Sequence, residues 1–362
     1  MNTVKFNHSD NTEFVKVLRK RVNSYFKENK ITKYANFSMK LKTVAMLLIY
    51  FLPLLLMLTG VIQSFWLVTA LWGIMGFGMA GIGFSVMHDA NHGTYSKNQK
   101  VNKAIAFVIS LIGGTSINWK IQHNVLHHSY TNIEGHDEDI SLEPLLRLSP
   151  SQKRYKAHRF QVFYVWALYS IMTLYWFSVK DFDQLNRYKN KDLLKGQGIT
   201  FNKALLGIIG NKILYIGVLI ALPLIFVQLP WWQTMIGFVV MHLICGVLLS
   251  TVFQCAHVVE ETEFFEVDEN ASMENNWAVH QMKTTLNFAQ KNKVLSWFVG
   301  GLNYQIEHHL FPNICHIHYS KISKIVKETA KEYHLPYHTH KTFFAALKSH
   351  VTLLNNLGVG KV

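Results

Sequence analysis

Cysteine is scarce in this sequence. Its 362 residues include three cysteines (Cys245, Cys255 and Cys315), and no two of them form a CxxC pair. This argues against a disulfide framework or a thiolate metal site and suits a reducing compartment. Acidic residues are also few, so the formal net charge is +14 with histidines neutral. No zinc-finger, helix-turn-helix or RNA-binding signature accompanies that charge, which disfavours nucleic-acid binding. The positive-inside bias of a membrane protein and attraction to anionic headgroups explain the excess better.

Charged residues are scarce as a whole, at 16% of the chain against 49% hydrophobic residues. The apolar residues gather in four blocks, each long enough to cross a bilayer as a helix. These blocks are residues 44–62, 65–87, 213–229 and 234–255. Only a few residues separate the first block from the second and the third from the fourth. The pattern therefore predicts two transmembrane hairpins.

The basic N-terminal arm, residues 1–43, predicts the side of the membrane. It has no signal-peptide shape and is expected in the cytoplasm. Two further apolar stretches, 104–117 and 160–179, are expected to lie in the headgroup plane. A fifth crossing would place the basic stretch 180–203 outside and set His257 opposite His88. We expect an all-α integral membrane protein with four transmembrane helices in two hairpins, interfacial helices and a cytosolic helical cap. Residues 358–362 form a short tail, and both termini are expected to be cytoplasmic.

Histidine is the most informative residue type, with 19 copies gathered largely in clusters. Two histidines spaced i, i+4 share one face of a helix, so both can reach one metal ion. An isolated pair of this kind is more often a packing or surface feature. Here three clusters and one further histidine all fall at the predicted cytoplasmic ends, which predicts a metal site. The candidate ligands are His88, His92, His123, His127, His128, His257, His308 and His309.

The ligand type narrows the choice of metal. Eight histidines exceed what one ion can hold, so two ions are implied. Imidazole suits zinc, copper, iron and nickel. The Glu-x-x-His pattern of soluble di-iron bundles is absent. A neutral, nitrogen-rich shell at a membrane surface suits the oxidation of lipid. A redox-inert di-zinc site, which would mean hydrolysis, stays as the second interpretation.

Acidic residues beside the clusters can accept the outer ring N–H of a ligating histidine and so fix its tautomer. We expect this role for Asp89 and Glu307, which lie inside the clusters. For the other acidic neighbours a solvated turn is an equal alternative; they are Glu134, Asp137, Asp139 and Glu260.

Several other polar residues carry weaker signals. His280 is a minor candidate for contact with the site, directly or through water. Other histidines are expected to pack in the cap or to be solvated, namely His316, His318, His334, His338 and His340. His242 lies inside the fourth block and can be neutral and paired, while Lys212 can extend its charge to the interface. Glycines of the second block are expected to allow close helix packing.

Read together, the clusters resemble the histidine boxes of the membrane fatty acid desaturase family. The family patterns HxxxH, HxxxHH and (H/Q)xxHH match residues 88–92, 123–128 and 305–309. The extra histidine after the last span resembles His257. Glutamine at the start of the third box, Gln305, resembles the branch that contains linoleoyl-CoA and front-end desaturases, in which this position is a weak ligand or none. The resemblance extends over roughly residues 39–357, so we expect one desaturase domain at 44–357.

The resemblance implies a di-iron enzyme with O2 as co-substrate. Such an enzyme removes two hydrogens from adjacent methylenes of a fatty acyl chain, leaving a cis double bond. The acyl carrier would be CoA, a membrane lipid or acyl carrier protein. Many front-end relatives carry a fused cytochrome b5 domain with a His-Pro-Gly-Gly motif. None of the seven prolines here follows a histidine. Electrons are therefore expected from an external ferredoxin or cytochrome b5.

Three alternatives stay open at this point. A related di-iron membrane hydroxylase would carry the same boxes, and a sphingolipid desaturase would act on a different lipid. A non-redox membrane zinc protein belongs to another class. A transporter of that class should carry polar ligands inside its spans, whereas these ligands cluster at the span ends.

Overall fold

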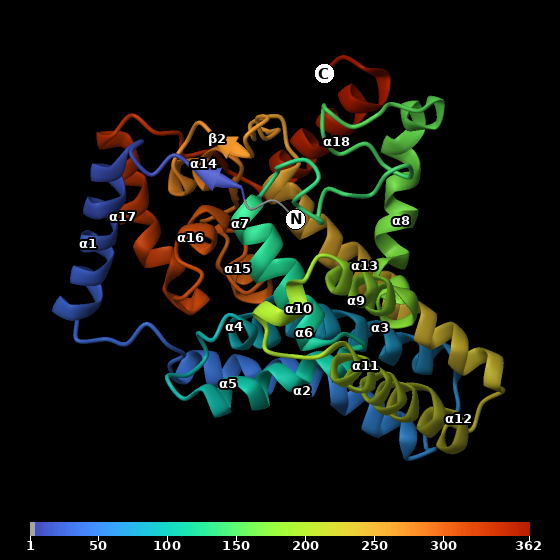
Figure 1. Ribbon diagram of the computed structural model, residues 1–362. Helices are drawn as coiled ribbons and strands as arrows, with labels where there is room; N and C mark the ends of the chain where they lie inside the picture. The colour runs from blue at the N-terminus through green and yellow to red at the C-terminus, as the bar shows by residue number, and fades with distance from the viewer. Residues whose placement is uncertain (1–3) are drawn as a thin grey trace. The chain divides into compact units, whose positions relative to one another are not determined.

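The computed structural model describes residues 4–362 and is almost entirely helical (Figure 1). Strands in this part of the chain are two residues long. β1 (Lys5–Phe6) pairs in parallel with β2 (Ser272–Met273), and β3 (Asn287–Phe288) with β4 (Thr339–His340). The all-α expectation is confirmed.

The chain divides into two compact units. The polar unit comprises residues up to Ala35, Gln122–Val165 and Thr251–Val362, and the apolar unit comprises Asn36–Ile121 and Trp166–Ser250. Three elements run across the division along the chain: η3 (Lys120–His127), α8 (Gln161–Tyr175) and α13 (Trp231–His257). The polar unit contains α1 (Thr12–Glu28), α7 (His128–Tyr130), η4 (Lys156–Phe160), α14 (Trp277–Lys283), α15 (Lys293–Phe298), α16 (Gln305–Leu310), η7 (His316–His318), α17 (Tyr319–Glu332) and α18 (Phe343–Val359).

The apolar unit is built from long helices interrupted by short π-helical or 3-10 turns. Its elements are α2 (Phe37–Leu58), α3 (Phe65–Gly81), η1 (Ile82–Val86), α4 (Met87–Asn91), α5 (Gln99–Ala106), η2 (Phe107–Ile112), α6 (Ser116–Trp119), η5 (Trp176–Lys180), α9 (Asp181–Asn190), α10 (Leu193–Gly196), α11 (Phe201–Ile216), η6 (Gly217–Ala221) and α12 (Leu222–Phe226).

Two glycines of α3 let neighbouring helices approach closely. A Cβ on Gly78 would lie 2.7 Å from the backbone nitrogen of Tyr50 in α2. A Cβ on Gly76 would lie 2.7 Å from the carbonyl oxygen of Met241 in α13. Because real Cβ atoms do not approach backbone so closely, a side chain at either position would push the helices apart. The predicted packing role of these glycines is confirmed.

A sharp break separates α5 and η2 from α6. Gly113 adopts φ +86°, a left-handed conformation that costs glycine little. The helical segments on either side of the break, Gln99–Ile112 and Ser116–Tyr130, are bent by 106°. The apolar stretch 104–117 therefore turns back within itself, and the chain after the turn leads into the second histidine box.

A buried ion pair in the apolar unit lies at this break. The Lys212 ammonium in α11 is 2.6 Å from Asp181 Oδ2 and also donates to the carbonyl oxygens of Gly113 and Trp176. The other Asp181 oxygen accepts from Thr115. Lys212 thus does not extend to the interface as expected but pairs inside the unit. His242 is paired as expected, with Tyr215 at 2.8 Å and Thr173 at 3.0 Å.

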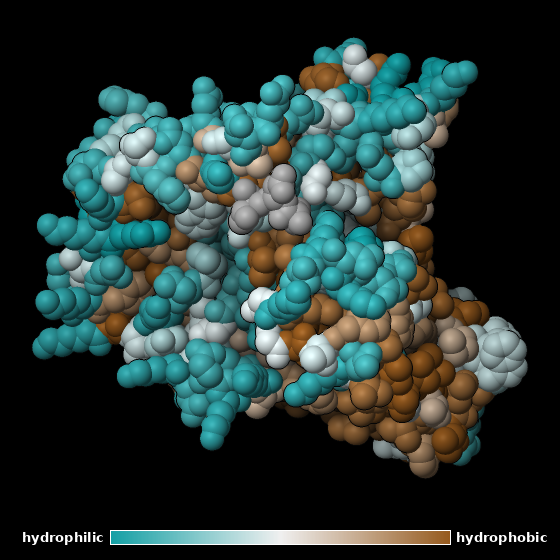
Figure 2. Space-filling model, viewed as in Figure 1, coloured by the Kyte–Doolittle hydropathy of each residue, from teal (hydrophilic) through white to brown (hydrophobic). Residues whose placement is uncertain are grey.

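Large apolar side chains remain exposed over α11 and α12, where hydrophobic residues gather on the visible face (Figure 2). Leu206, Ile213 and Ile225 keep 70%, 67% and 71% of their surface accessible. A water-soluble protein rarely exposes a continuous patch of this kind. This surface is therefore suited to contact with lipid.

Five helices within residues 4–362 are long and apolar enough to cross a membrane. They are Phe37–Leu58, Phe65–Asn91, Lys156–Asn190, Phe201–Phe226 and Trp231–His257. Four of them contain most of the four predicted blocks. The fifth, Lys156–Asn190, contains the stretch 160–179 that we expected in the headgroup plane. By length and composition it passes the same test as the others.

In the polar unit, α1 and α17 pack side by side (Figure 1). Phe14, Leu18 and Val22 repeat every four residues, so they form one apolar face of α1. This face joins a buried cluster that includes Ile322 and Val326 of α17. The α1 helix of the N-terminal arm is therefore folded into the unit.

The segment after His257 is held by α18. His350 is fully buried, and its Nδ1 lies 2.6 Å from the carbonyl oxygen of Val258. Burial lowers the pKa of His350 to about 4, although the hydrogen bond opposes the shift. The ring is thus neutral in the folded state and takes up a proton on unfolding below pH 6.5. Its contribution to stability is present above pH 6.5 and is lost as the pH falls toward 4.

We therefore expect the stability advantage of the wild type over a His350→Asn variant to shrink with acid. Asparagine retains an N–H donor but does not titrate. Between pH 7.5 and pH 5 the wild type should lose about 2 kcal/mol more unfolding free energy than the variant. Denaturant unfolding of both proteins at the two pH values measures the difference. Equal losses would show that His350 is not the titrating group.

Candidate metal centre

The second histidine box is carried by a helix that changes from π to α. η3 ends at His127, and α7 begins at His128. π-helical turns occur frequently at functional sites. The His123 and His127 rings stack with centroids 5.4 Å apart, so both point from one face. The next ring, His128, places its Nε2 3.2 Å from the Nε2 of His123.

The third box meets the second within the polar unit. α16 carries His308 and His309, both fully buried. His308 Nε2 lies 3.0 Å from His128 Nε2, and the His309 ring stacks on His128 with centroids 4.3 Å apart. Residues 180 positions apart in sequence are thus brought together.

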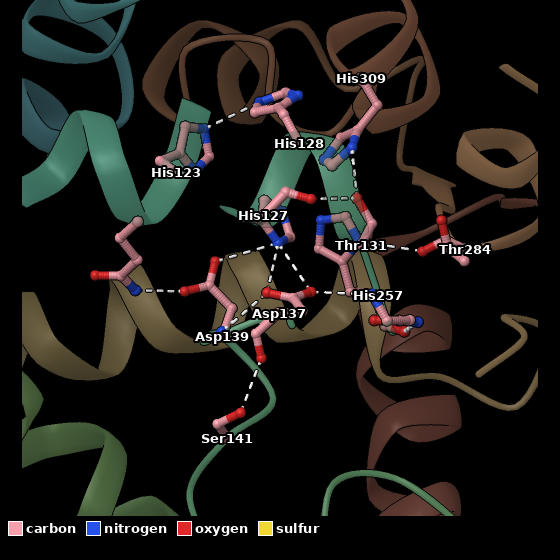
Figure 3. Close-up of polar contacts among 12 residues, drawn as sticks. His123, His127, His128, Thr131, Asp137, Asp139, Ser141, His257, Thr284 and His309 are labelled. Carbon is pink, nitrogen blue, oxygen red and sulfur yellow. Dashed lines mark hydrogen bonds and ion pairs between the residues drawn. The ribbon is translucent and has the colours of Figure 1, made fainter. Parts of the chain in front are cut away.

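The single histidine at the end of α13 belongs to the same cluster (Figure 3). The His257 ring lies 4.7 Å from the His127 ring and 4.8 Å from the His309 ring, measured between centroids. One ring nitrogen from each of His127, His257 and His309 lies within 4.8 Å of the other two. The same holds for His128, His308 and His309. The polar unit therefore contains two overlapping groups of three nitrogens, each able to hold an ion.

Each of four rings in these groups has a different partner for its outer nitrogen, Nδ1. His127 faces the Asp137 carboxylate at 3.1 Å, and Asp139 at 3.3 Å. His257 faces the carbonyl oxygen of Thr284 at 3.1 Å, His308 the hydroxyl of Tyr319 at 3.1 Å, and His309 the amide oxygen of Gln281 at 2.7 Å. A proton on Nδ1 leaves the lone pair of Nε2 available to a metal.

Asp137 is the strongest of these partners. Burial alone would raise the pKa of its carboxyl group, but the His127 ring and two backbone N–H donors hold that pKa below its ordinary value. The donors are the amides of Asn132 and Asp139, each at 2.9 Å. Asp137 is therefore an anion that accepts from the His127 ring (Figure 3).

The donor set fits a metal ion. Among the described residues, the Nε2 atoms of His127 and His309 are buried and have no hydrogen-bond partner. A buried ring nitrogen without a partner is costly and calls for an explanation. Nearby, the Nε2 atom of His128 lies 3.2 Å from that of His123 and 3.0 Å from that of His308. Converging lone pairs of neutral imidazoles are stabilised by a cation between them.

The first box lies in the apolar unit. His88 and His92, at the start of α4 and just after it, have ring centroids 4.7 Å apart, and both rings contact Trp119 edge-on. Asp89 Oδ1 lies 4.0 Å from His88 Nδ1. The i, i+4 pair therefore shares one face, as the spacing predicts.

The other sequence candidates have varied surroundings. Glu307 accepts from Asn287 and Tyr337, both at 2.9 Å, and burial raises the pKa of its carboxyl to about 7. Its two oxygens thus hold α16 in place. Glu260 is exposed, and its backbone N–H donates to Ser349. Glu134 lies 3.4 Å from the Gln152 amide.

Two candidates lie next to the histidine groups. The Gln305 side-chain amide is 2.9 Å from His257 Nε2. His280 is fully buried between the rings of Phe6 and Phe265, and its Nε2 is 2.7 Å from the carbonyl oxygen of Thr131. His280 thus supports the loop that follows the second box.

Three residues of the site were not among the candidates predicted from the sequence: Gln281, Thr284 and Tyr319. Each contacts the outer nitrogen of a box histidine, yet each lies between boxes or beyond the last. Two stretches that resemble the desaturase family, 277–281 and 311–319, include Gln281 and Tyr319, but neither indicates that these residues contact a box histidine.

Comparisons with known proteins agree on one family. Residues 64–341 match the family model described as fatty acid desaturase. The chain is 38% identical over 350 residues to an sn-1 linoleoyl-lipid 6-desaturase of Synechocystis, covering 95% of each chain. It is 35% identical to the enzyme of that name from Arthrospira platensis, covering 99% of this chain and 96% of the relative. An acyl-lipid (8-3)-desaturase of Physcomitrium patens is 34% identical, covering 99% and 74%. With more than half of the chain matched by the model and nearly all of it by these relatives, this protein belongs to the fatty acid desaturase family.

Proposed function

We propose that this protein is an acyl-lipid desaturase that introduces a cis double bond into the fatty acyl chain of a membrane lipid. The acyl chain gives up two hydrogens, and O2 is reduced to two waters with two electrons and two protons from outside. The electrons would come from a separate ferredoxin or cytochrome b5. Family membership and the acyl-lipid names of the relatives support this assignment.

The observation that carries the proposal is the convergence of buried histidine nitrogens in the polar unit. Two bound iron ions would supply the activation of O2. We assign their ligands to the eight box histidines: His88, His92, His123, His127, His128, His257, His308 and His309. Iron is favoured over zinc because the family reaction is a redox reaction, and zinc does none. Gln305 is assigned as a weak ligand or a neighbour of His257.

The protein's own residues position these rings and exclude water. Each outer nitrogen with an acceptor is fixed as an N–H donor, so the ring is held in one tautomer and one orientation. Full burial of His308, His309 and Gln305 keeps bulk water away from the reacting centre. No side chain is required as a nucleophile or a general base.

Replacing Asp137 by asparagine should weaken the centre without removing a ligand. The amide has no charge, and its NH2 group would face a backbone N–H donor or the His127 N–H. We expect iron affinity and desaturation to fall by about 10- to 100-fold. Iron retained per chain against a competing chelator measures the first effect. Glu260→Gln, at an exposed acid, is the matched control, and an equal loss in that control would contradict the assigned role of Asp137.

We further propose four membrane crossings, with Lys156–Asn190 lying at the interface. Parity supports this arrangement: two crossings precede His88, and the bent pair after it, taken as a re-entrant loop and not as a broken span, would return the chain to the same side. If Lys156–Asn190 crossed, His257 would end opposite His88. With four crossings every box lies on the cytoplasmic side, together with the basic N-terminal arm and the C-terminus. In this arrangement residues 44–357 form one functional domain.

Expression in a host that lacks such desaturases, with an electron donor supplied, tests the function. Mass spectrometry of each lipid class should show acyl chains lighter by two hydrogens in membrane glycerolipids. A new product heavier by one oxygen would instead favour the hydroxylase, and a product confined to sphingolipids the sphingolipid desaturase. An unchanged lipid profile despite iron-loaded, folded protein would contradict desaturation.

A further inference from the structure

The outer nitrogen of His309 faces a glutamine that no histidine box contains. Gln281 comes from α14, which packs against α16. Its Oε1 lies 2.7 Å from His309 Nδ1. Both residues are fully buried, so bulk water does not compete for this hydrogen bond.

A third residue joins this contact. The Thr131 hydroxyl lies 3.3 Å from His309 Nδ1. It is also 2.9 Å from the same Gln281 oxygen and 2.7 Å from the carbonyl oxygen of His127. It can donate its single proton to either. Thr131 therefore connects Gln281 to the helical turn of the second box, one turn after His127.

The amide orientation decides which nitrogen of His309 is available. With the oxygen toward the ring, Nδ1 must carry the proton, and Nε2 keeps its lone pair. With the amide reversed, its NH2 group would donate to Nδ1, and the proton would move to Nε2. Among the described residues Nε2 of His309 is buried and has no partner. A proton there would be a buried donor without an acceptor, which is costly. The Gln281 Nε2 is likewise buried without a partner among the described residues. The orientation of Oε1 toward Nδ1, and not the cost of an unpaired donor, therefore assigns the tautomer.

Gln281 differs from the partners of the other rings. His127 is held by carboxylates and His257 by a backbone carbonyl. Unlike a carboxylate or a backbone carbonyl, an amide side chain can present either an acceptor or a donor to the ring, as the Tyr319 hydroxyl beside His308 also can. At His309 the side chain of Gln281 therefore selects the tautomer, and it does so without adding negative charge to the site.

From these contacts we infer that Gln281 is a positioning residue. It holds His309 as the Nδ1–H tautomer and so presents Nε2 to the iron centre. The inference rests on the proposed function, because it requires His309 to be an iron ligand.

Three variants of the full-length protein test this role. Gln281→Leu removes the acceptor at similar volume, and Gln281→Glu retains an oxygen that can only accept. Gln161→Leu is the control: Gln161 is also fully buried in the polar unit, and its side chain bonds to Arg147 and Leu354. Each protein is loaded with ferrous iron, and iron retention against a chelator, the electronic spectrum of the centre and thermal stability are measured.

We expect Gln281→Leu to lose about 10- to 100-fold in iron affinity and to alter the spectrum. Gln281→Glu should restore binding, while Gln161→Leu should lower stability without changing iron affinity. Wild-type protein that binds iron, together with a Gln281→Leu variant that binds it equally well, would overturn the inference alone. Loss of iron in Gln281→Glu but not in Gln281→Leu would also overturn it. Wild-type protein that folds but binds no iron would overturn both the inference and the proposed function.

Discussion

A His127→Ala variant should produce no detectable double bond in a host that gains one from the wild-type protein. His127 stacks on His123, contacts His257 and His309, and offers a buried Nε2 that has no partner among the described residues. Loss of a hydrogen-bond partner behind a ligand typically costs 10- to 100-fold, so loss of the ligand should leave less than about 1% of the activity. The fatty-acid profile of the host measures the change.

The control for this variant is another buried histidine of the polar unit. His350→Asn removes an imidazole of α18 whose Nδ1 bonds to the carbonyl oxygen of Val258. It should retain most of the desaturation at neutral pH. If His127→Ala remained active at a tenth of the wild-type rate or more, His127 would not be a ligand. If His350→Asn were equally inactive, a general loss of folding would explain both results.

The second large effect concerns the stability of the apolar unit. Replacing Lys212 by methionine leaves the Asp181 carboxylate, whose side chain is 0% exposed, without its cation. Removing one partner of a buried ion pair typically costs 3–5 kcal/mol, so we expect the variant to lose about 4 kcal/mol of unfolding free energy. Asp181→Asn should cost a similar amount, because the ammonium would retain only the carbonyl oxygens of Gly113 and Trp176. Thermal unfolding of the purified proteins gives the comparison.

A double-mutant cycle separates the ion pair from other effects. Asparagine at 181 can still accept from the Thr115 hydroxyl. The variant carrying both Lys212→Met and Asp181→Asn should therefore be more stable than the sum of the single losses predicts, by about 2 kcal/mol. Additive losses would show that the two groups do not stabilise each other.

The sequence contained the information for much of the helical architecture. Long apolar runs can be recognised without tertiary contacts, because a bilayer core demands about 20 apolar residues in a helix. The four predicted blocks fall largely within α2, α3, α11 with η6 and α12, and α13. The ends of the helices were predicted less accurately than the blocks. A helix can continue through a polar residue such as Lys212 when that residue has a buried partner. Asp181, that partner, lies 31 positions away and outside every apolar block.

The shared orientation of His123 and His127 was also predictable, because i, i+4 spacing fixes a shared helix face. The residues that support the box histidines were not. Tyr319 and Gln281 reach the histidines only through the packing of α17 and α14 against α16, which no local pattern announces. The acidic candidates show the same limit of sequence reasoning. Asp137 contacts His127, while Glu307, inside a box, bonds to Asn287 and Tyr337.

The iron content of the purified protein tests the central claim most directly. Metal analysis of folded protein, expressed with adequate iron, should give two irons per chain. The His127→Ala variant, purified in parallel, should contain less. Zinc in place of iron in an otherwise intact protein, or iron equal in both proteins, would contradict the histidine-held di-iron centre.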